Sequence, residues 1–390
     1  MDNKAYIVAA HRTPIGKSGR RGVFKDTRAE DMLAFIIKST LEKIPALKPE
    51  QVDDVVVGCS FPEGTMGFNI ARVVALVAGL PEEVPGVTVN RFCSSGLQAI
   101  AYATQQIEAG LGGDEIILAG GVEMMSSVPL GGNMPRPYPN PNFAYIYTPM
   151  GITAENVANK YNISREKQDE FAYKSQMKAK AARDGGFYKE IIPTPATVFE
   201  NGKKTSIIVE HDQGIRDATT IEGLAKLRPV FAKKGSVTAG NSSQTSDGAA
   251  IAVVMSGRKV KELGLKPIAK LTNFVAVGCD PEEMGVGPRY AIPKLLKVAG
   301  KQVKDIGLFE INEAFASQAL YCVKELGIDQ SKVNIYGGAV ALGHPLGCTG
   351  AKLCATLLSG MQANKVKYGV EAMCIGGGMG AAGLFELMEN

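Results

Sequence analysis

The chain reads Val87-Thr88-Val89-Asn90-Arg91-Phe92-Cys93-Ser94-Ser95-Gly96-Leu97 where a predicted strand meets a predicted helix. Val87–Val89 is rich in β-branched residues, which predicts a buried strand. From Leu97 to Glu108 the apolar residues recur at helical spacing, Ser94 and Ser95 favour a helix start, and Gly110 predicts its end. A strand that runs directly into a helix is typical of an α/β fold.

Cys93 stands at this junction between strand and helix. Its thiol would face the free N–H groups and the positive end of the helix dipole, and both favour the thiolate. The thiolate is the nucleophilic form of cysteine. A free cysteine can also be a small apolar core residue. The local pattern therefore favours a nucleophile at Cys93 and leaves a packing role open.

Strand and helix patterns alternate on both sides of this junction. Strands are predicted at Ala5–Ala9, Asp54–Val57, Glu115–Leu118, Leu308–Glu310, Lys332–Ile335 and Tyr368–Ile375. Helices are predicted at Ala29–Ile44, Asn69–Ala78, Ala314–Leu326 and Gly350–Met361. Glu115–Gly121 also resembles Ala372–Gly378, so the halves can be laid over one another. We therefore predict two similar α/β domains that pack together.

The middle of the chain, about Val122–Asp247, interrupts this alternation. Pro129–Pro149 is rich in Pro, Gly, Asn and Tyr, which predicts an irregular loop. Ile163–Ala182 has the pattern of a charged amphipathic helix that Ser164 can cap. The segment holds sixteen Lys and Arg against thirteen Asp and Glu. We predict an inserted domain at 122–247, between an N-terminal half at 1–121 plus 248–268 and a C-terminal half at 269–390.

The composition limits the classes of protein to consider. The 390 residues are 45% hydrophobic, but no apolar run approaches the ~18–20 residues that span a bilayer. Seven cysteines without a Cys-x-x-Cys pair, and three histidines, argue against a disulfide framework or a metal site. A net charge of +4 without a basic cluster gives no indication of nucleic acid binding. The first residues lack signal-peptide character, so we expect a soluble cytoplasmic protein.

Three further residues are candidates for chemistry. His344 lies in Gly343-His344-Pro345, among glycines and just before a helix pattern. Cys374 ends an apolar strand and precedes Gly376-Gly377-Gly378, a run that can turn tightly and bring backbone N–H groups to an oxyanion. Asn312 follows the strand at Leu308 and is either a helix cap or part of a site. His11 and His211 lack such settings, and we expect them to be surface or structural residues.

Taken together, these motifs resemble the thiolase family over essentially the whole chain. The resemblance rests on Cys93-Ser94-Ser95-Gly96, Asn312-Glu313-Ala314-Phe315, Gly343-His344-Pro345 and Cys374-Ile375-Gly376-Gly377-Gly378. Asn90–Gln98 and Asn241–Gly248 are closer to degradative 3-ketoacyl-CoA thiolases than to biosynthetic acetoacetyl-CoA thiolases. Pro149 stands where the biosynthetic pattern has His. The resemblance implies a thiolase-like, five-layered αβαβα fold of two duplicated α/β domains with an inserted loop domain.

The resemblance also implies catalytic roles. Cys93 would attack the 3-keto carbon of a 3-ketoacyl-CoA and hold the acyl group as a thioester, while His344 takes its proton. Cys374 would protonate the leaving acetyl-CoA enolate and later deprotonate the incoming CoA. A thiol near its unperturbed pKa of ~8.5 can serve both steps. His344 with a water held by Asn312 would stabilise one oxyanion, and the N–H groups of Cys93 and Gly376 the other.

The inserted domain would then bind coenzyme A, which is a co-substrate and not a permanently bound cofactor. Arg216 matches a family arginine at the adenine and phosphate end of CoA, and Ser243 matches a pantetheine contact. Ala239 lies in the matching segment Thr238–Ser243. Apolar lining positions are matched by Met150, Phe231, Met284, Phe315 and Leu346.

Other functions remain open at this stage. Acetoacetyl-CoA synthesis uses the same fold, and chain-length kinetics would distinguish it. A decarboxylating condensing enzyme is disfavoured because Asn312 stands where its second histidine would be. A non-catalytic acyl-CoA-binding protein or complex subunit is disfavoured by the complete set of motifs. The family forms homodimers or homotetramers, and either state, or a β-oxidation dehydrogenase or hydratase partner, is compatible with the resemblance.

Overall fold

The strands of the computed structural model, which describes residues 4–200 and 203–389, form two half-sheets that meet at one edge. The first half-sheet has the order β4-β3-β5-β8-β1 and the second the order β10-β11-β12-β9. They join where Ile7 pairs with Ala269. The strands are β1 (Ala5–Arg12), β2 (Gly16–Lys17, paired with β8), β3 (Asp54–Gly58), β4 (Val87–Val89), β5 (Ile116–Met124), β8 (Ser246–Ser256), β9 (Ala269–Gly278), β10 (Leu308–Ile311), β11 (Tyr368–Ile375) and β12 (Met379–Leu387).

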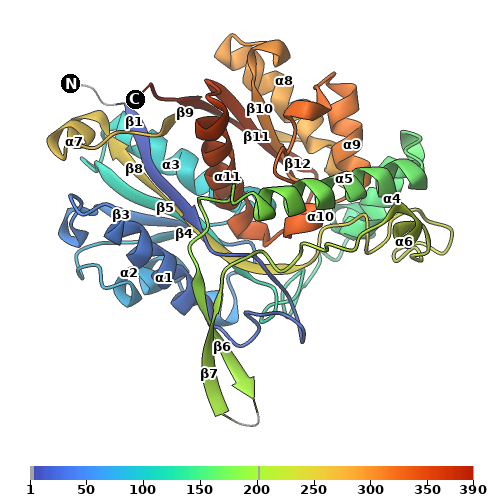
Figure 1. Ribbon diagram of the computed structural model, residues 1–390, viewed down its shortest axis with the longest axis horizontal. Coiled ribbons are helices and arrows are strands. Elements are labelled where there is room, and N and C mark those ends of the chain that lie inside the picture. Colours follow the sequence, from blue (N-terminus) through green and yellow to red (C-terminus); the bar gives the residue numbers. More distant parts are fainter. Residues whose placement is uncertain (1–3, 201–202, 390) are drawn as a thin grey trace.

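Helices cover both half-sheets and fill the space between them, which gives five layers (Figure 1). α1 (Ala29–Glu42) and α2 (Ile70–Val77) pack on the outer face of the first half-sheet. α3 (Ser95–Ala109) and α11 (Thr349–Asn364) lie between the half-sheets, in a core to which both contribute. α8 (Gly287–Ala299) and α9 (Ala316–Glu325) cover the outer face of the second half-sheet. The predicted αβαβα fold is confirmed.

The strand order also confirms the internal duplication. β3, β5, β8 and β1 follow one another across the first half-sheet as β10, β11, β12 and β9 do across the second. The ladders start with Asp54 opposite Ile117 and Leu308 opposite Gly369. Ile117 and Gly369 both lie at the start of these ladders, whereas the alignment of Glu115–Gly121 with Ala372–Gly378 places Ile117 opposite Cys374, near the end of β11. That alignment is therefore displaced along the strand.

The predicted strand at Lys332–Ile335 is wrong. The segment forms only a 3₁₀ turn at Gln330–Lys332 and one parallel bridge between Val333 and Phe309. The first half-sheet has strand β4 at the corresponding edge. The Asn334 side chain replaces the missing ladder, because it accepts from the Ile311 N–H at 2.8 Å and donates to the Ile311 carbonyl at 2.9 Å. Its backbone has φ 44°, which ends the extended conformation.

The strand at Val87–Val89 exists, but it is not buried. β4 pairs only with β3 at the edge of the half-sheet, and Val87 is 44% exposed. A short apolar run has the same pattern at an edge and in a sheet centre, so sequence periodicity does not separate the two. Gly110 ends α3 with φ 65°, as predicted. Ser94 precedes the helix, but its hydroxyl makes no cap bond.

The insertion lies between β5 and β8. It contains α4 (Met150–Lys160), α5 (Arg165–Asp184), the hairpin of β6 (Thr194–Glu200) and β7 (Lys203–Val209), and α6 (Ile221–Ala225). Ser164 caps α5 by accepting from the Lys167 N–H, as predicted. The hairpin extends away from the layered body (Figure 1). The short helices α7 (Gly257–Glu262) and α10 (Ala339–Leu342) follow later in the chain.

A buried ion pair fastens the insertion to the N-terminal half. Arg12 donates to both carboxylate oxygens of Asp212, at 2.7 and 3.0 Å, and to Glu190 at 3.2 Å. All three side chains are almost completely buried.

Among residues 4–200 and 203–389, no helix combines the length and apolar character that a membrane crossing needs.

Candidate active site

The predicted nucleophile lies in a tight turn between β4 and α3. Cys93 is the middle residue of a 3₁₀ turn at Phe92–Ser94. Phe92 has φ 42°, an uncommon conformation for a bulky residue, and its N–H donates to the Asn90 carboxamide at 2.8 Å. Asn90 in turn donates to the Ser60 carbonyl. The surrounding structure thus stabilises a strained backbone directly before the thiol, as is common at functional sites.

The Cys93 thiol is buried against apolar side chains. It packs with Met125 and Leu346, and Phe61 and Phe92 lie against this cluster. Burial raises the pKa of the Cys93 thiol to about 12; the Glu123 charge raises it further, whereas hydrogen bonds from the Gly376 N–H and its own N–H lower it. The N–H groups at the helix end favour the thiolate, as expected, but desolvation outweighs them and the resting thiol keeps its proton.

His344 faces two side chains through its two ring nitrogens. Its Nδ1 lies 2.5 Å from the Thr349 hydroxyl, and its Nε2 lies 3.4 Å from the Asn312 Nδ2. Burial, followed by the nearby Lys352 charge, lowers the pKa of His344 to about 3. The imidazole is thus neutral. Because the Asn312 amide donates to Nε2, the proton resides on Nδ1 and Nε2 keeps the lone pair that a general base needs.

The loop that carries His344 reaches the nucleophile. Leu346, two residues further along, contacts the Cys93 cluster. Gly343 has φ 101°, and a Cβ there would lie 2.4 Å from the Ser246 hydroxyl, so this position needs glycine. The His344 N–H donates to the same hydroxyl at 3.2 Å. The backbone around the histidine is thereby packed against β8.

Asn312 is held at the end of β10. Its N–H donates to the Ala372 carbonyl at 2.9 Å, and its side chain is buried. Its Oδ1 has no hydrogen-bond partner among the described residues. A buried acceptor of this kind normally has a partner, so the site has the polarity that a bound water needs. The neighbouring Glu313 is structural, because it accepts from Ser175 and Asn334.

Cys374 ends β11 and faces the same site. It is fully buried, and the proximity of Cys93 is one of the causes, after burial, that raise the pKa of its thiol well above the usual value. The expectation of an unperturbed pKa is therefore wrong. The turn at Gly376–Gly378, where Gly377 and Gly378 have φ 79° and 82°, directs the Gly376 N–H toward the Cys93 sulfur.

The predicted substrate contacts fall into an apolar group and an exposed group. Met284 packs on Cys374 with Met150 and Phe315. Phe231 lies edge-to-face against Phe315, with ring centroids 6.0 Å apart. Ser243 donates its N–H to the Ala314 carbonyl at 2.9 Å beside this cluster.

Arg216 and Ala239 are exposed and form no part of that apolar cluster. Arg216 and Arg21 both lie close to Lys17, and burial, followed by the charges of these two arginines, lowers the pKa of Lys17. Sequence reasoning assigned no role to Lys17 or Arg21, because the chain brings them to Arg216 only through the contact between the β2 region and the insertion. Gln213 makes that contact, since it accepts from the N–H groups of Lys17 and Val23.

Two further residues of the site were missed from the sequence. Thr349 begins α11 and contacts His344, and its polar side chain in an apolar helix start was the available signal. Glu123 accepts from the N–H groups of Ser60, Phe61 and Gly347, and so joins the loops after β3 and before α11. A single acid at the end of a buried strand was its only signal in the sequence.

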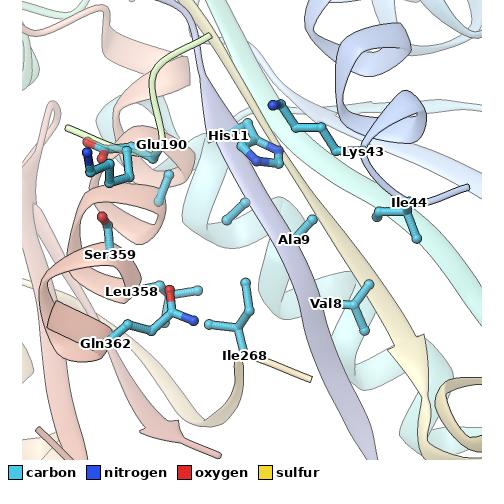
Figure 2. Close-up of a pocket in the computed structure, with 13 residues that line it drawn as sticks. Val8, Ala9, His11, Lys43, Ile44, Glu190, Ile268, Leu358, Ser359 and Gln362 are labelled. Atoms are coloured by element: carbon cyan, nitrogen blue, oxygen red, sulfur yellow. The ribbon is translucent and has the colours of Figure 1, made fainter. Parts of the chain in front are cut away.

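A cavity of about 250 Å³ lies elsewhere, between β1, the end of α1 and α11 (Figure 2). His11, Lys43, Glu190 and Gln362 line it, and none of the predicted catalytic residues does. Burial and the Lys43 charge lower the pKa of His11 to about 4, and its ring bonds to Thr40 at 3.2 Å. No cysteine lines this cavity, and none of Cys93, Asn312, His344 and Cys374 reaches it, so the thiol site is the better candidate for the predicted chemistry. In the described part of the chain, no group of three His, Cys, Asp or Glu residues could hold a metal ion.

The duplicated five-layered fold, with two buried cysteines and a histidine on facing loops and strand ends, defines an α/β protein with a thiol site. The sequence matches the family models of the thiolase N-terminal domain over residues 5–258 and the thiolase C-terminal domain over 265–387. The chain belongs to the thiolase family, which are acyltransferases.

Relatives support this membership along the whole chain. A 3-ketoacyl-CoA thiolase of Bacillus subtilis is 49% identical over 396 residues, with 98% of this chain and 99% of that protein covered. The human peroxisomal 3-ketoacyl-CoA thiolase is also 49% identical, with 98% and 91% covered. Among solved structures, human mitochondrial 3-ketoacyl-CoA thiolase superposes with a TM-score of 0.88 at 38% identity, with 100% of both chains covered. An acetyl-CoA acetyltransferase of Bacillus anthracis gives 0.89 at 38% identity, with 99% of both chains covered.

Proposed function

We propose that this thiolase is a degradative 3-ketoacyl-CoA thiolase. It uses CoA to cleave 3-ketoacyl-CoA into acetyl-CoA and a shortened acyl-CoA, in fatty-acid β-oxidation. One observation above all supports the proposal: Cys93 lies near Cys374 and contacts Leu346 of the loop that carries His344, and His344 lies against Asn312. The sequence identity of 46–49% to 3-ketoacyl-CoA thiolases over nearly the full chain supports the choice of substrate.

Acylation begins from a neutral pair. The Cys93 sulfur attacks C3 of the substrate, and the Nε2 of His344 takes the thiol proton as the S–C bond forms. The keto oxygen becomes an oxyanion next to the Cys93 sulfur, where the N–H groups of Cys93 and Gly376 already donate toward that sulfur. Loss of one such donor typically raises a barrier by about 3–4 kcal/mol. The C2–C3 bond then breaks and releases the enolate of acetyl-CoA.

Cys374 donates a proton to the enolate and later accepts one from CoA. Its S–H protonates C2 of the enolate, which becomes acetyl-CoA, and the resulting thiolate later takes the S–H proton of the incoming CoA. Burial raises the pKa of Cys374, so the resting group carries the proton that the first step needs. The enolate oxygen lies toward His344 and Asn312. The unpartnered Oδ1 of Asn312 suits a water that donates one hydrogen bond to this Oδ1 and one to the enolate oxygen.

Coenzyme A enters along the insertion. Its phosphates are anionic, and Arg216, Lys17 and Arg21 lie together without an ion pair to an acidic residue in the described part of the chain. Phosphate would replace this mutual repulsion with charge-assisted hydrogen bonds. The pantetheine and acyl chains would pass Ser243 and Ala239 and contact the apolar side chains of Met150, Phe231, Met284, Phe315 and Leu346.

We also propose the domain boundaries 1–121 plus 248–268, 122–247 and 269–390, a cytoplasmic location and a homodimer or homotetramer. All seven cysteines are free, which suits a reducing compartment. Large apolar side chains are exposed near the β4 edge, including Phe68 at 96% and Val87 at 44%. Exposed apolar surface at a sheet edge is typical of an interface between subunits.

The test is a cleavage assay with purified full-length protein. Acetoacetyl-CoA and a long 3-ketoacyl-CoA are mixed separately with CoA, and the loss of the 3-keto thioester absorbance is followed. Cleavage of the long substrate supports the proposal. Absence of cleavage with both substrates would refute it and favour a non-catalytic acyl-CoA-binding protein or complex subunit.

The second candidate is an acetoacetyl-CoA thiolase. It is favoured by the superposition on the Bacillus anthracis acetyl-CoA acetyltransferase at a TM-score of 0.89. The same assay separates the two, because activity confined to acetoacetyl-CoA would transfer the assignment to this candidate.

A further inference from the structure

Cys374 has one polar side chain within hydrogen-bond reach in the described part of the chain. Its sulfur lies 3.9 Å from Oε1 of Gln318 on α9, a distance that suits a weak S–H···O bond. Met284 and Ala314 pack on Cys374 in an apolar cluster, and the Cys93 thiol lies nearby. The thiol and the amide are both fully buried. The amide is therefore the side chain that can respond to the protonation state of Cys374.

The other end of the Gln318 amide has no partner. Its Nε2 is buried and makes no hydrogen bond to any described residue. A buried donor without an acceptor costs free energy, and its presence in a native site calls for an explanation. Rotation about the terminal torsion of glutamine exchanges Oε1 and Nε2, and that torsion has two broad minima. No hydrogen bond of Nε2 has to break for this rotation.

Gln318 is held where it lies by close packing around its Cβ. A Cβ at Gly285 would approach the Gln318 Cβ to 2.7 Å, so glycine at 285 lets α9 come this close. The neighbouring Ser317 donates to the Ala154 carbonyl of α4 at 3.0 Å. The stem of Gln318 is thus fixed, and no hydrogen bond of Nε2 to a described residue opposes a rotation of the terminal amide.

We propose that Gln318 is a positioning residue whose amide serves both protonation states of Cys374. Its carbonyl oxygen accepts from the S–H before the thiol protonates C2 of the enolate. After that transfer the amide rotates, and its N–H donates to the thiolate until the thiolate takes the proton of CoA. The inference rests on the proposed function, in which Cys374 alternates between thiol and thiolate.

The Gln318 amide can offset part of the desolvation penalty that burial imposes on the Cys374 thiolate. Desolvation and the neighbouring Cys93 disfavour the thiolate of Cys374, as the raised pKa of this thiol reflects. An N–H donor offsets part of that penalty because hydrogen bonds to a charged group are stronger than neutral ones. A carboxylate at position 318 would accept from the thiol but repel the thiolate. A thioether would do neither.

The experiment measures the ionisation of Cys374 without turnover. In full-length protein with the Cys93→Ser change, iodoacetamide modifies Cys374 at a rate proportional to its thiolate fraction. Mass spectrometry of the Cys374 peptide gives this rate across pH. We expect Gln318→Met to lower the rate about tenfold at fixed pH, since loss of a charge-assisted bond raises the pKa by about one unit. Gln318→Glu should lower it further.

Steady-state kinetics supply a second readout and are measured in protein that retains Cys93. Gln318→Met should lower kcat about tenfold and leave the KM for acyl-CoA within about twofold, because the amide acts on the proton transfers and not on substrate binding. Thermal unfolding is measured for each variant as a control for folding. Alkylation rates within about twofold of the parent in both folded variants would overturn the proposal and leave Gln318 as a packing residue.

If Gln318→Met does not fold, Gln318→Glu carries the test because it keeps the side-chain shape. If neither folds, glutamine-labelled protein is compared with its Cys374→Ala variant, and side-chain amide resonances that do not change would overturn the proposal. Failure of this inference is distinguishable from failure of the proposed function. A wild-type protein that cleaves 3-ketoacyl-CoA but shows no dependence of Cys374 on Gln318 refutes only the inference.

Discussion

Replacement of Thr349 by valine tests whether the hydroxyl sets the tautomer and the basicity of His344. The Thr349 Oγ1 lies 2.5 Å from Nδ1 of His344, and both side chains are buried. Valine keeps the branched shape at the start of α11 but offers no acceptor to the Nδ1–H. The neutral imidazole then has less reason to keep its proton on Nδ1, and the Nε2–H tautomer cannot act as a base toward Cys93.

The magnitude follows from two losses. A neutral hydrogen bond contributes about 0.5–1.5 kcal/mol, and its loss shifts the tautomer equilibrium by that amount. In the transition state the imidazole becomes positively charged, and its bond to Thr349 is roughly twice as strong as the neutral one. Together these effects amount to about 2 kcal/mol, or about 30-fold in kcat/KM for acylation.

The assay is stopped-flow measurement of the acyl-enzyme burst with 3-ketoacyl-CoA. Thr349→Ser is the matched control, because it keeps the hydroxyl and should retain kcat/KM within about threefold. Thermal unfolding of both variants reports on the start of α11. A Thr349→Val protein that folds normally and acylates within about twofold of wild type would refute the reasoning, since the hydrogen bond would then carry no catalytic energy.

Three further predictions follow from the same site and its surroundings. Cys93→Ser should bind CoA and lose turnover, whereas Cys374→Ser should still form the acyl-enzyme; normal acylation of the Cys93 variant, seen by intact mass, would contradict these roles. The kcat/KM for acylation should not change between about pH 5 and 9, because the pKa of His344 is lowered to about 3 and that of Cys93 is raised to about 12. Neither group then titrates within this pH range. A kinetic pKa of 6–7 that vanishes in a histidine variant would exclude the neutral pair. Asp212→Ala should lower the free energy of unfolding by about 3 kcal/mol, because it leaves the buried Arg12 with Glu190 alone; a urea denaturation change below about 1 kcal/mol would contradict this.

Secondary structure was predictable where apolar periodicity and turn residues agree. α3 has apolar residues at helical spacing and ends at Gly110 in the left-handed conformation, so both its length and its stop were predictable. Lys332–Ile335 shows how such reasoning fails. Its local pattern favours a strand, but the Asn334 side chain takes over the hydrogen bonds to Ile311 that a strand would have made.

The ionisation of the site was not predictable from local pattern. Proximity to a helix start favours a thiolate at Cys93, but the side chains that desolvate this thiol come from other parts of the chain. Met125 lies after β5 and Leu346 before α11, and together they bury the sulfur. A dipole effect is local to a few residues, whereas a desolvation penalty depends on everything that excludes water.

By itself, the sequence determined the α/β class, the internal duplication, the insertion and the identity of the motifs around Cys93, Asn312, His344 and Cys374. These depend on residue type and spacing, which are local properties of a chain. Only the tertiary structure decided that β4 is an edge strand, that the thiols and the imidazole are neutral, and that Thr349 and Gln318 contact His344 and Cys374. The physical reason is that strand order, burial and side-chain contacts arise between segments distant in sequence, which no local pattern encodes.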